Sequence, residues 1–199
     1  MSLSVAAALF GFAFVTTATP GPNNLMLMAS GANFGFRRTL PHMLGIVAGL
    51  TLLTLLAGAG LMALFEASPA LRTALRIASV AYLLWLACKV ATAAPLSESS
   101  SAGRPMTFLQ AVAFQWVNPK AWAIGLSAIA IYAPGRSLLA VATVAAVFAV
   151  VCFPAISIWA WLGTVVRRWL SSAGRRRLFN IAMAALLVAS LYPVIGLHR

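Results

Sequence analysis

The segment Thr19-Pro20-Gly21-Pro22-Asn23-Asn24 (residues 19–24) interrupts an otherwise apolar stretch that covers residues 3–28. Its two prolines each remove a backbone donor and crowd the preceding turn, and its glycine adds backbone freedom. A continuous helix is therefore not expected. We predict that one helix ends in this segment and that a second begins through Leu25 and Met26, with the Asn23 side chain placed to cap it.

The composition around this segment is that of an integral membrane protein. Of the 199 residues, 62% are hydrophobic and 8% are charged. A soluble domain of this length has too little interior to bury so much apolar surface, whereas lipid can solvate it. Soluble enzymes, disordered tails and secreted disulfide scaffolds are excluded.

Six apolar stretches are long enough to cross a bilayer, since a hydrocarbon core of about 30 Å takes roughly 20 residues of helix. They cover residues 3–28, 43–65, 70–90, 106–133, 138–166 and 178–197. The first is interpreted as an uncleaved span rather than a signal peptide, because the first 36 residues contain no Lys or Arg. The polar segment 95–105 is interpreted as a linker. We predict one transmembrane domain over residues 1–199, with repeats at about 1–94 and 106–199.

The net charge of +12 arises from 14 Lys and Arg residues against two Glu residues. Most of the cations lie between apolar stretches and no nucleic-acid-binding motif is present, so the predicted partner is the lipid bilayer and not nucleic acid. Nine cations fall on one side of the predicted topology and four on the other. The richer side is expected to be cytoplasmic, which leaves both termini outside.

The predicted topology has a geometric consequence. Each half contains three spans, an odd number, so two halves that share a fold must be inserted in opposite orientations. The predicted fold class is an all-α integral membrane protein of six transmembrane helices, arranged as two inverted three-helix repeats. The first helix of each repeat is broken at proline. Secondary transporters commonly use this architecture and place the substrate site near the midplane.

A second interruption, QWVNPK (residues 115–120), lies in the fourth stretch at the position that corresponds to the first. Paired proline-interrupted spans in two halves are a strong sequence pointer to a transport site, because opened backbone at membrane depth must be buried in protein or line a cavity. The candidate substrate-binding residues are Pro20, Gly21, Pro22, Asn23, Asn24, Gln115, Asn118, Pro119 and Lys120.

Lys120 is the one charge predicted near the centre of a span, where an unpaired ammonium costs roughly 2.5 to 3.5 kcal/mol on insertion scales. Glu66 and Glu98 lie in loops or at helix ends and cannot compensate it. Four arrangements stay open: a neutral amine, an ammonium surrounded by carbonyls and amides, snorkelling to the surface, or contact with an anionic group of the substrate. Without a carboxylate in the spans, a small neutral zwitterion fits better than a basic cargo.

Other features carry weaker predictions. Gly45 and Gly49 form a GxxxG pair that permits close helix contact, either within the chain or between subunits of a homo-oligomer. His42 and His198 are far apart and lack the spacing of a metal site. No metal or cofactor is expected.

The TPGPNN segment, the Gly-rich second stretch and NPKA (residues 118–121) together resemble the LysE/RhtB family of amino-acid exporters. The resemblance covers nearly the whole chain. It is greatest to the branch that exports cysteine and O-acetylserine, through residues 81–93, 114–118 and 180–188. It implies efflux of amino acids from the cytoplasm across the bacterial inner membrane, with proton coupling.

The predicted function is export of small neutral amino acids, either cysteine/O-acetylserine-like or threonine/homoserine-like, by alternating access. One alternative is a membrane-embedded enzyme. Such an enzyme needs a nucleophile with a base or a metal, whereas the chain has no Asp and no His is predicted in the middle of a span. The other alternative is an accessory subunit of a membrane complex, for which helix breaks would be unnecessary.

Overall fold

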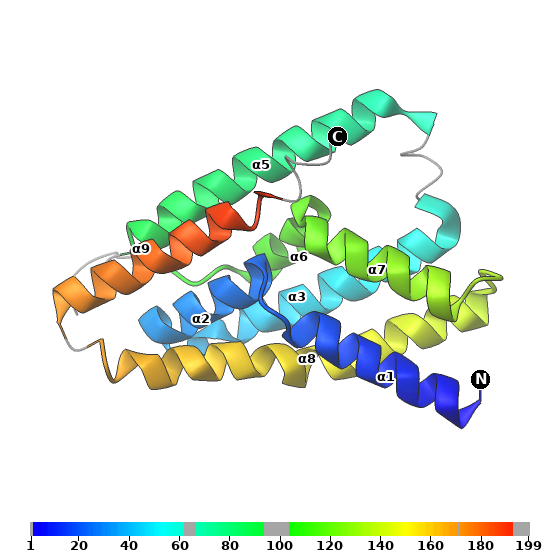
Figure 1. Cartoon of the computed structure of the whole chain (residues 1–199), viewed down its shortest axis with the longest axis horizontal. Helices are drawn as coiled ribbons and strands as arrows, with labels where there is room; N and C mark the ends of the chain where they lie inside the picture. Colours follow the sequence, from blue (N-terminus) through cyan, green and yellow to red (C-terminus); the bar gives the residue numbers. More distant parts are fainter. Residues whose placement is uncertain (1, 62–66, 94–103, 171, 193–199) are drawn as a thin grey trace.

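The computed structural model describes residues 2–61, 67–93, 104–170 and 172–192 (Figure 1). Regular structure in these ranges is helical, which confirms the all-α class. The α-helices are α1 (Leu3–Ala18), α2 (Pro22–Phe34), α3 (Phe36–Leu56), α5 (Pro69–Ala91), α6 (Phe108–Val117), α7 (Pro119–Tyr132), α8 (Leu138–Arg167) and α9 (Ala173–Ala189). A π-helical segment, η1 (Ala57–Leu61), continues α3. Most of the linker predicted at 95–105 lies outside the described residues.

Three helices in the described ranges are long and apolar enough to cross a membrane: α3 with η1 (Phe36–Leu61), α5 and α8. The pair α1 and α2 forms a fourth span if it is counted as one helix bent by 59°. Helices α6, α7 and α9 are shorter, at 10, 14 and 17 residues. The count of six spans and the inverted relation of the two halves stay predictions.

The helix of the second apolar stretch begins seven residues earlier than predicted, at Phe36 rather than at residue 43. Gly35 separates α2 from α3 with a φ of +84°, a backbone conformation that favours glycine. Arg37 and Arg38 then occupy the first turn of α3 with exposed side chains. The early start places His42 inside this candidate span, as its seventh residue and close to its N-terminal end.

The helices pack so that each half of the chain contacts the broken helices of the other half. Helix α8 lies along both α1 and α2, whereas α3 lies along α6 and also contacts α7 and α8 (Figure 1). Helices α5 and α9 pack against each other at one edge. The two breaks are thereby brought together, with Asn24, Gln115 and Asn118 buried and Thr19 and Pro20 exposed.

Small residues permit the closest of these helix contacts. A Cβ atom added to Gly31 of α2 would collide with the carbonyl oxygen of Ala160 in α8. One added to Gly163 of α8 would collide with the carbonyl oxygen of Met28 in α2. The two helices therefore approach until backbone meets backbone, which only a glycine at each point allows.

The GxxxG pair of α3 faces α6 within the same chain. A Cβ atom at Gly45 would come within 2.6 Å of the Ala111 Cβ, and one at Gly49 would come within 2.6 Å of the Gln115 Cγ. Of the two alternatives for this motif, the structure has the internal contact. The missing side chain of Gly49 also leaves room for Gln115, which is one of the candidate site residues.

Candidate substrate site at the two helix breaks

The ammonium group of Lys120 joins the two breaks. Its Nζ donates hydrogen bonds to the carbonyl oxygen of Thr19 at 2.6 Å, to the Thr19 Oγ1 at 2.9 Å and to the carbonyl oxygen of Pro20 at 3.2 Å. Lys120 is the second residue of α7, whereas Thr19 and Pro20 follow the last residue of α1. The Lys120 Nζ thus contacts two carbonyl oxygens and one hydroxyl at the exposed end of α1, and the choice among the four arrangements considered for this side chain stays a prediction.

Further side chains from other helices satisfy the carbonyl groups at the end of α1. The Asn24 Nδ2 donates to the carbonyl oxygens of Thr17 and Thr19, both at 2.7 Å. The Trp159 Nε1 of α8 donates to the carbonyl oxygen of Ala18 at 2.7 Å. The last carbonyls of a helix have no partner within the helix and carry its partial negative charge. The end of α1 is therefore held by donors from α2, α7 and α8.

Asn23 and Gln115 form a reciprocal pair between α2 and α6. The Asn23 Nδ2 donates to the Gln115 Oε1 at 2.8 Å, and the Gln115 Nε2 donates to the Asn23 Oδ1 at 3.2 Å. The Gln115 Nε2 also donates to the carbonyl oxygen of Ala111 at 3.0 Å. Gln115 is fully buried. These contacts join the interrupted segment of the first half to that of the second.

The two helices that restart after the breaks differ at their N-termini. Helix α7 is capped, because the Asn118 Oδ1 accepts a hydrogen bond from the backbone N–H of Lys120 at 3.1 Å. Helix α2 has Gly21 at its N-cap position and no side-chain cap. The prediction that Asn23 caps α2 is wrong, because α2 already starts at Pro22 and Gln115 engages the Asn23 side chain. The first turn of α2 thus keeps uncapped N–H donors.

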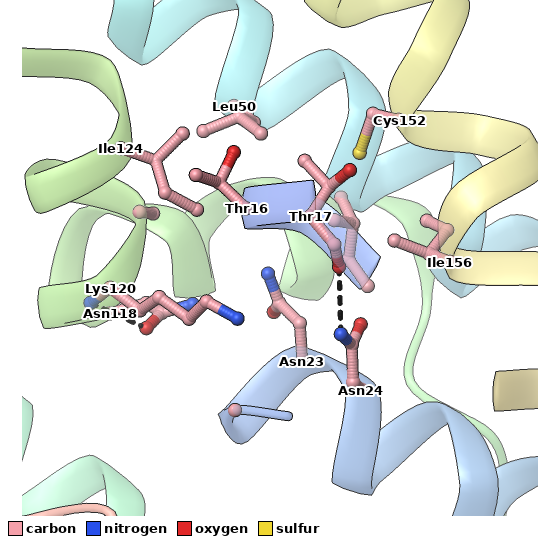
Figure 2. Close-up of a pocket in the computed structure, with 13 residues that line it drawn as sticks. Thr16, Thr17, Asn23, Asn24, Leu50, Asn118, Lys120, Ile124, Cys152 and Ile156 are labelled. Atoms are coloured by element: carbon pink, nitrogen blue, oxygen red, sulfur yellow. Dashed lines mark hydrogen bonds between the residues drawn. The ribbon is translucent and has the colours of Figure 1, made fainter. Parts of the chain in front are cut away.

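A small pocket lies between the breaks (Figure 2). Its volume is about 20 Å³, enough for about one water molecule and too small for an amino acid. In Figure 2, Asn23, Asn24 and Lys120 lie on one side, with Leu50, Cys152 and Ile156 on others. The lining residues are Thr16, Thr17, Gly21, Asn23, Asn24, Ile46, Leu50, Asn118, Lys120, Ala121, Ile124, Cys152 and Ile156.

One polar atom at this pocket has no partner. The Oδ1 of Asn24 is buried and accepts no hydrogen bond among the described residues, although the Nδ2 of the same amide makes two. A buried acceptor without a donor costs roughly 1 to 3 kcal/mol, so such atoms in a protein call for an explanation. None of the residues that line the pocket is acidic. A ligand that donates a hydrogen bond would satisfy this oxygen.

The structure places all nine candidate residues at or next to the breaks. Five of them line the pocket: Gly21, Asn23, Asn24, Asn118 and Lys120. Gln115 pairs with Asn23, Pro20 accepts from Lys120, and Pro22 and Pro119 begin α2 and α7.

Several pocket residues were not predicted from the sequence. They are the Thr16 and Thr17 side chains of α1 and the apolar groups of α3, α7 and α8. Trp159, which holds the end of α1 from a distant helix, was also missed. The pair Thr16-Thr17, two polar residues just before the break, was the available signal. For Cys152, Ile156 and Trp159 there was none, because they lie in a uniformly apolar stretch.

Long apolar helices are typical of a membrane protein, and two proline breaks that contact each other beside a small pocket are typical of the transporter class. The comparison of sequences agrees. Residues 8–190 match the family described as LysE type translocator, and the chain belongs to this family.

Relatives are similar over nearly their whole length. The Cysteine/O-acetylserine efflux protein of Escherichia coli (strain K12) is 30% identical over 190 residues, which cover 94% of this chain and 96% of the relative. The protein of the same name from Shigella sonnei (strain Ss046) has the same identity and coverage. No solved structure matches the chain significantly.

Proposed function

We propose that this protein exports small neutral amino acids of the cysteine/O-acetylserine type from the cytoplasm across the bacterial inner membrane. The observation that carries the proposal is the set of complementary groups at one pocket: the Lys120 ammonium, the uncapped start of α2 and the unpaired Asn24 Oδ1. Membership of the LysE type translocator family and the relatives' printed function support it. They favour transport over the enzyme and accessory-subunit alternatives.

The cargo is placed by its charges. Its carboxylate meets the N–H donors at the start of α2, where the helix dipole favours a negative group, with Lys120 beside it. Its ammonium donates to the Oδ1 of Asn24. Its side chain meets Ile46, Leu50 and other apolar groups of the pocket. A basic side chain would find no acidic partner among the lining residues.

Cargo binding must also widen the pocket, and Lys120 connects the binding of cargo to this widening. A carboxylate next to the ammonium competes with the carbonyl oxygens of Thr19 and Pro20 for its three hydrogens. Withdrawal of Lys120 releases the end of α1 from α7. Binding thereby loosens the contact between the two breaks, and the two halves can rock about the site by alternating access.

The repeat organisation is part of this proposal. Residues 1–94 and 106–199 form inverted repeats, as supported by the exchange of contacts in which α8 packs on α1 and α2 while α3 packs on α6. The cation-rich side faces the cytoplasm and both termini lie outside. Proton coupling and a homo-oligomeric state stay predictions.

Counterflow in liposomes that contain only this protein tests the function. We expect labelled O-acetyl-L-serine and L-cysteine to exchange against the same unlabelled amino acid well above the rate of protein-free liposomes. Lysine should not exchange, because a second ammonium has no acidic partner at the site. Absence of counterflow for these cargoes and for threonine and leucine would refute the proposed function.

Replacement of Gly49 by Ala is expected to reduce counterflow severalfold without loss of folded protein. The new methyl group would lie 2.6 Å from the Gln115 Cγ and displace the amide that pairs with Asn23. Gly135→Ala is the matched control, because a Cβ atom there meets nothing within 4 Å. If Gln115 is the target, Gln115→Ala should add little further loss in the Gly49→Ala background. Independent, additive losses would contradict this explanation.

A further inference from the structure

A second and larger cavity lies between α2, α5 and α6. Its volume is about 320 Å³, within the range of small-molecule sites. It is lined by the C-terminal halves of α2 and α5, the start of α6 and one residue of α3. These segments lie at the end of the molecule where α8 ends and α9 begins (Figure 1). That end carries the cations of the side we assign to the cytoplasm.

The cavity wall is mainly apolar but carries basic and polar side chains. Lys89 and Arg104 contribute two cations, and none of the lining residues is acidic. The Lys89 Nζ lies 4.3 Å from the centre of the Trp85 ring. Asn33 and Gln110 add amides. A concave basic wall with no acidic group attracts a ligand that carries a carboxylate.

His42 is an unsatisfied polar group in the same wall. The residue is 2% exposed, and neither ring nitrogen has a hydrogen-bond partner among the described residues. The nearby hydroxyls of Ser30 and Thr39 bond to each other at 2.8 Å, and Thr39 also donates to the carbonyl oxygen of Gly35. Burial of an imidazole with both nitrogens unpaired is unfavourable. Both ring nitrogens are covered by protein atoms, so a ligand in the cavity would offset that cost by pairing with the ring once a neighbouring side chain moves aside.

The cavity and the pocket at the breaks lie along the same two helices. Met26 of α2 and Gln110 of α6 line the cavity, whereas Asn23 and Gln115, about one turn away, form the pair beside the pocket. The Phe114 ring is fully buried and stacks on Tyr82 with 5.5 Å between centroids. The Asn23 side of the pair lines the pocket at the breaks, and the Tyr82 side of the ring stack lines the cavity.

We propose that the larger cavity is a loading site, which binds the carboxylate of a zwitterionic amino acid through Lys89, Arg104 and His42 before the cargo crosses to the pocket at the breaks. This assignment rests on the function proposed above. It adds a second binding step on the cytoplasmic side. It also explains how cargo is held while the inner pocket is too small to admit it.

The test separates the two sites by equilibrium binding. The full chain is placed in phosphatidylcholine nanodiscs and titrated with labelled O-acetyl-L-serine in a Lys120→Met background, which impairs the inner site. We expect binding to persist. Adding Lys89→Met or His42→Leu should weaken it at least fivefold, whereas Arg168→Gln, which removes an exposed cation outside the cavity, should leave it unchanged.

Three results would overturn the loading site: no binding in the Lys120→Met background, equal affinity with and without Lys89→Met, or equal weakening by Arg168→Gln. Loss of binding when the nanodiscs contain phosphatidylglycerol would also overturn it, because it would assign the cavity to a lipid headgroup. The proposed function fails separately, through absence of counterflow by the parent protein. Lys89 is exposed, so its replacement tests the site even if His42→Leu fails to fold.

Discussion

Replacement of Lys120 by Met is expected to reduce O-acetylserine counterflow at least tenfold while the protein still folds and inserts. The substitution removes three hydrogen bonds from an ammonium group to the end of α1, together with the cation that the cargo carboxylate approaches. A hydrogen bond to a charged group contributes about 1.5 to 3 kcal/mol. Loss of about 1.4 kcal/mol of transition-state stabilisation is enough to lower a rate tenfold. The measurement is the initial counterflow rate per folded molecule.

Two variants make this result specific. Lys120→Arg keeps the charge and several donors, and should retain more transport than Lys120→Met. Arg136→Gln removes a cation from an exposed turn and should transport like the parent protein. Parental rates in Lys120→Met would remove this residue from the mechanism.

Replacement of Gly163 by Leu should destabilise the protein more than any other substitution considered. Even a Cβ atom would lie 2.8 Å from the backbone nitrogen of Ala32 and would collide with the carbonyl oxygen of Met28. Backbone atoms cannot rotate away, so α2 must separate from α8. Overpacking costs about 1 to 3 kcal/mol and occasionally more, which corresponds to a fall of roughly 2 to 12 °C in melting temperature for a chain of this size.

Thermal unfolding of detergent-purified protein, followed by size-exclusion chromatography, measures this change. Gly11→Leu is the matched control, since a Cβ atom at Gly11 of α1 meets nothing within 4 Å. It should unfold at the parental temperature. Transport by Gly163→Leu should also fall, because α2 carries Asn23 and Asn24. A variant that keeps both the parental melting temperature and transport would show that α2 and α8 do not pack this closely.

The helix breaks were predictable because proline acts locally. Removal of a backbone donor at Pro20, Pro22 and Pro119 favours a break where Gly21 or a capping Asn118 stands beside it, and both interruptions occur where they were predicted. Proline alone is not sufficient, because Pro41 and Pro154 lie inside α3 and α8. The GxxxG spacing of Gly45 and Gly49 also predicted a close helix contact. The sequence did not identify the partner, which is α6 of the same chain.

Features that depend on distant contacts were not predictable. The role of Asn23 was assigned wrongly, because helix capping is a local rule and the actual partner, Gln115, is 92 residues away. The position of His42 inside α3 was missed because two exposed arginines precede it and hydropathy alone placed the start of the span beyond them. The ring nitrogen of Trp159 bonds to the end of α1, but the apolar sequence around Trp159 does not indicate this contact.

The side chains that satisfy the end of α1 have a consequence for biogenesis. Helix α1 is synthesised before α7 and α8, yet these later helices carry two of the donors that complete its last turn, Lys120 and Trp159. During translation α1 therefore emerges before the carbonyl groups of Ala18 and Pro20 have these partners. Water, lipid headgroups or the insertion machinery must shield them until α8 has emerged. The order of synthesis thus makes the break the last part of the first span to mature.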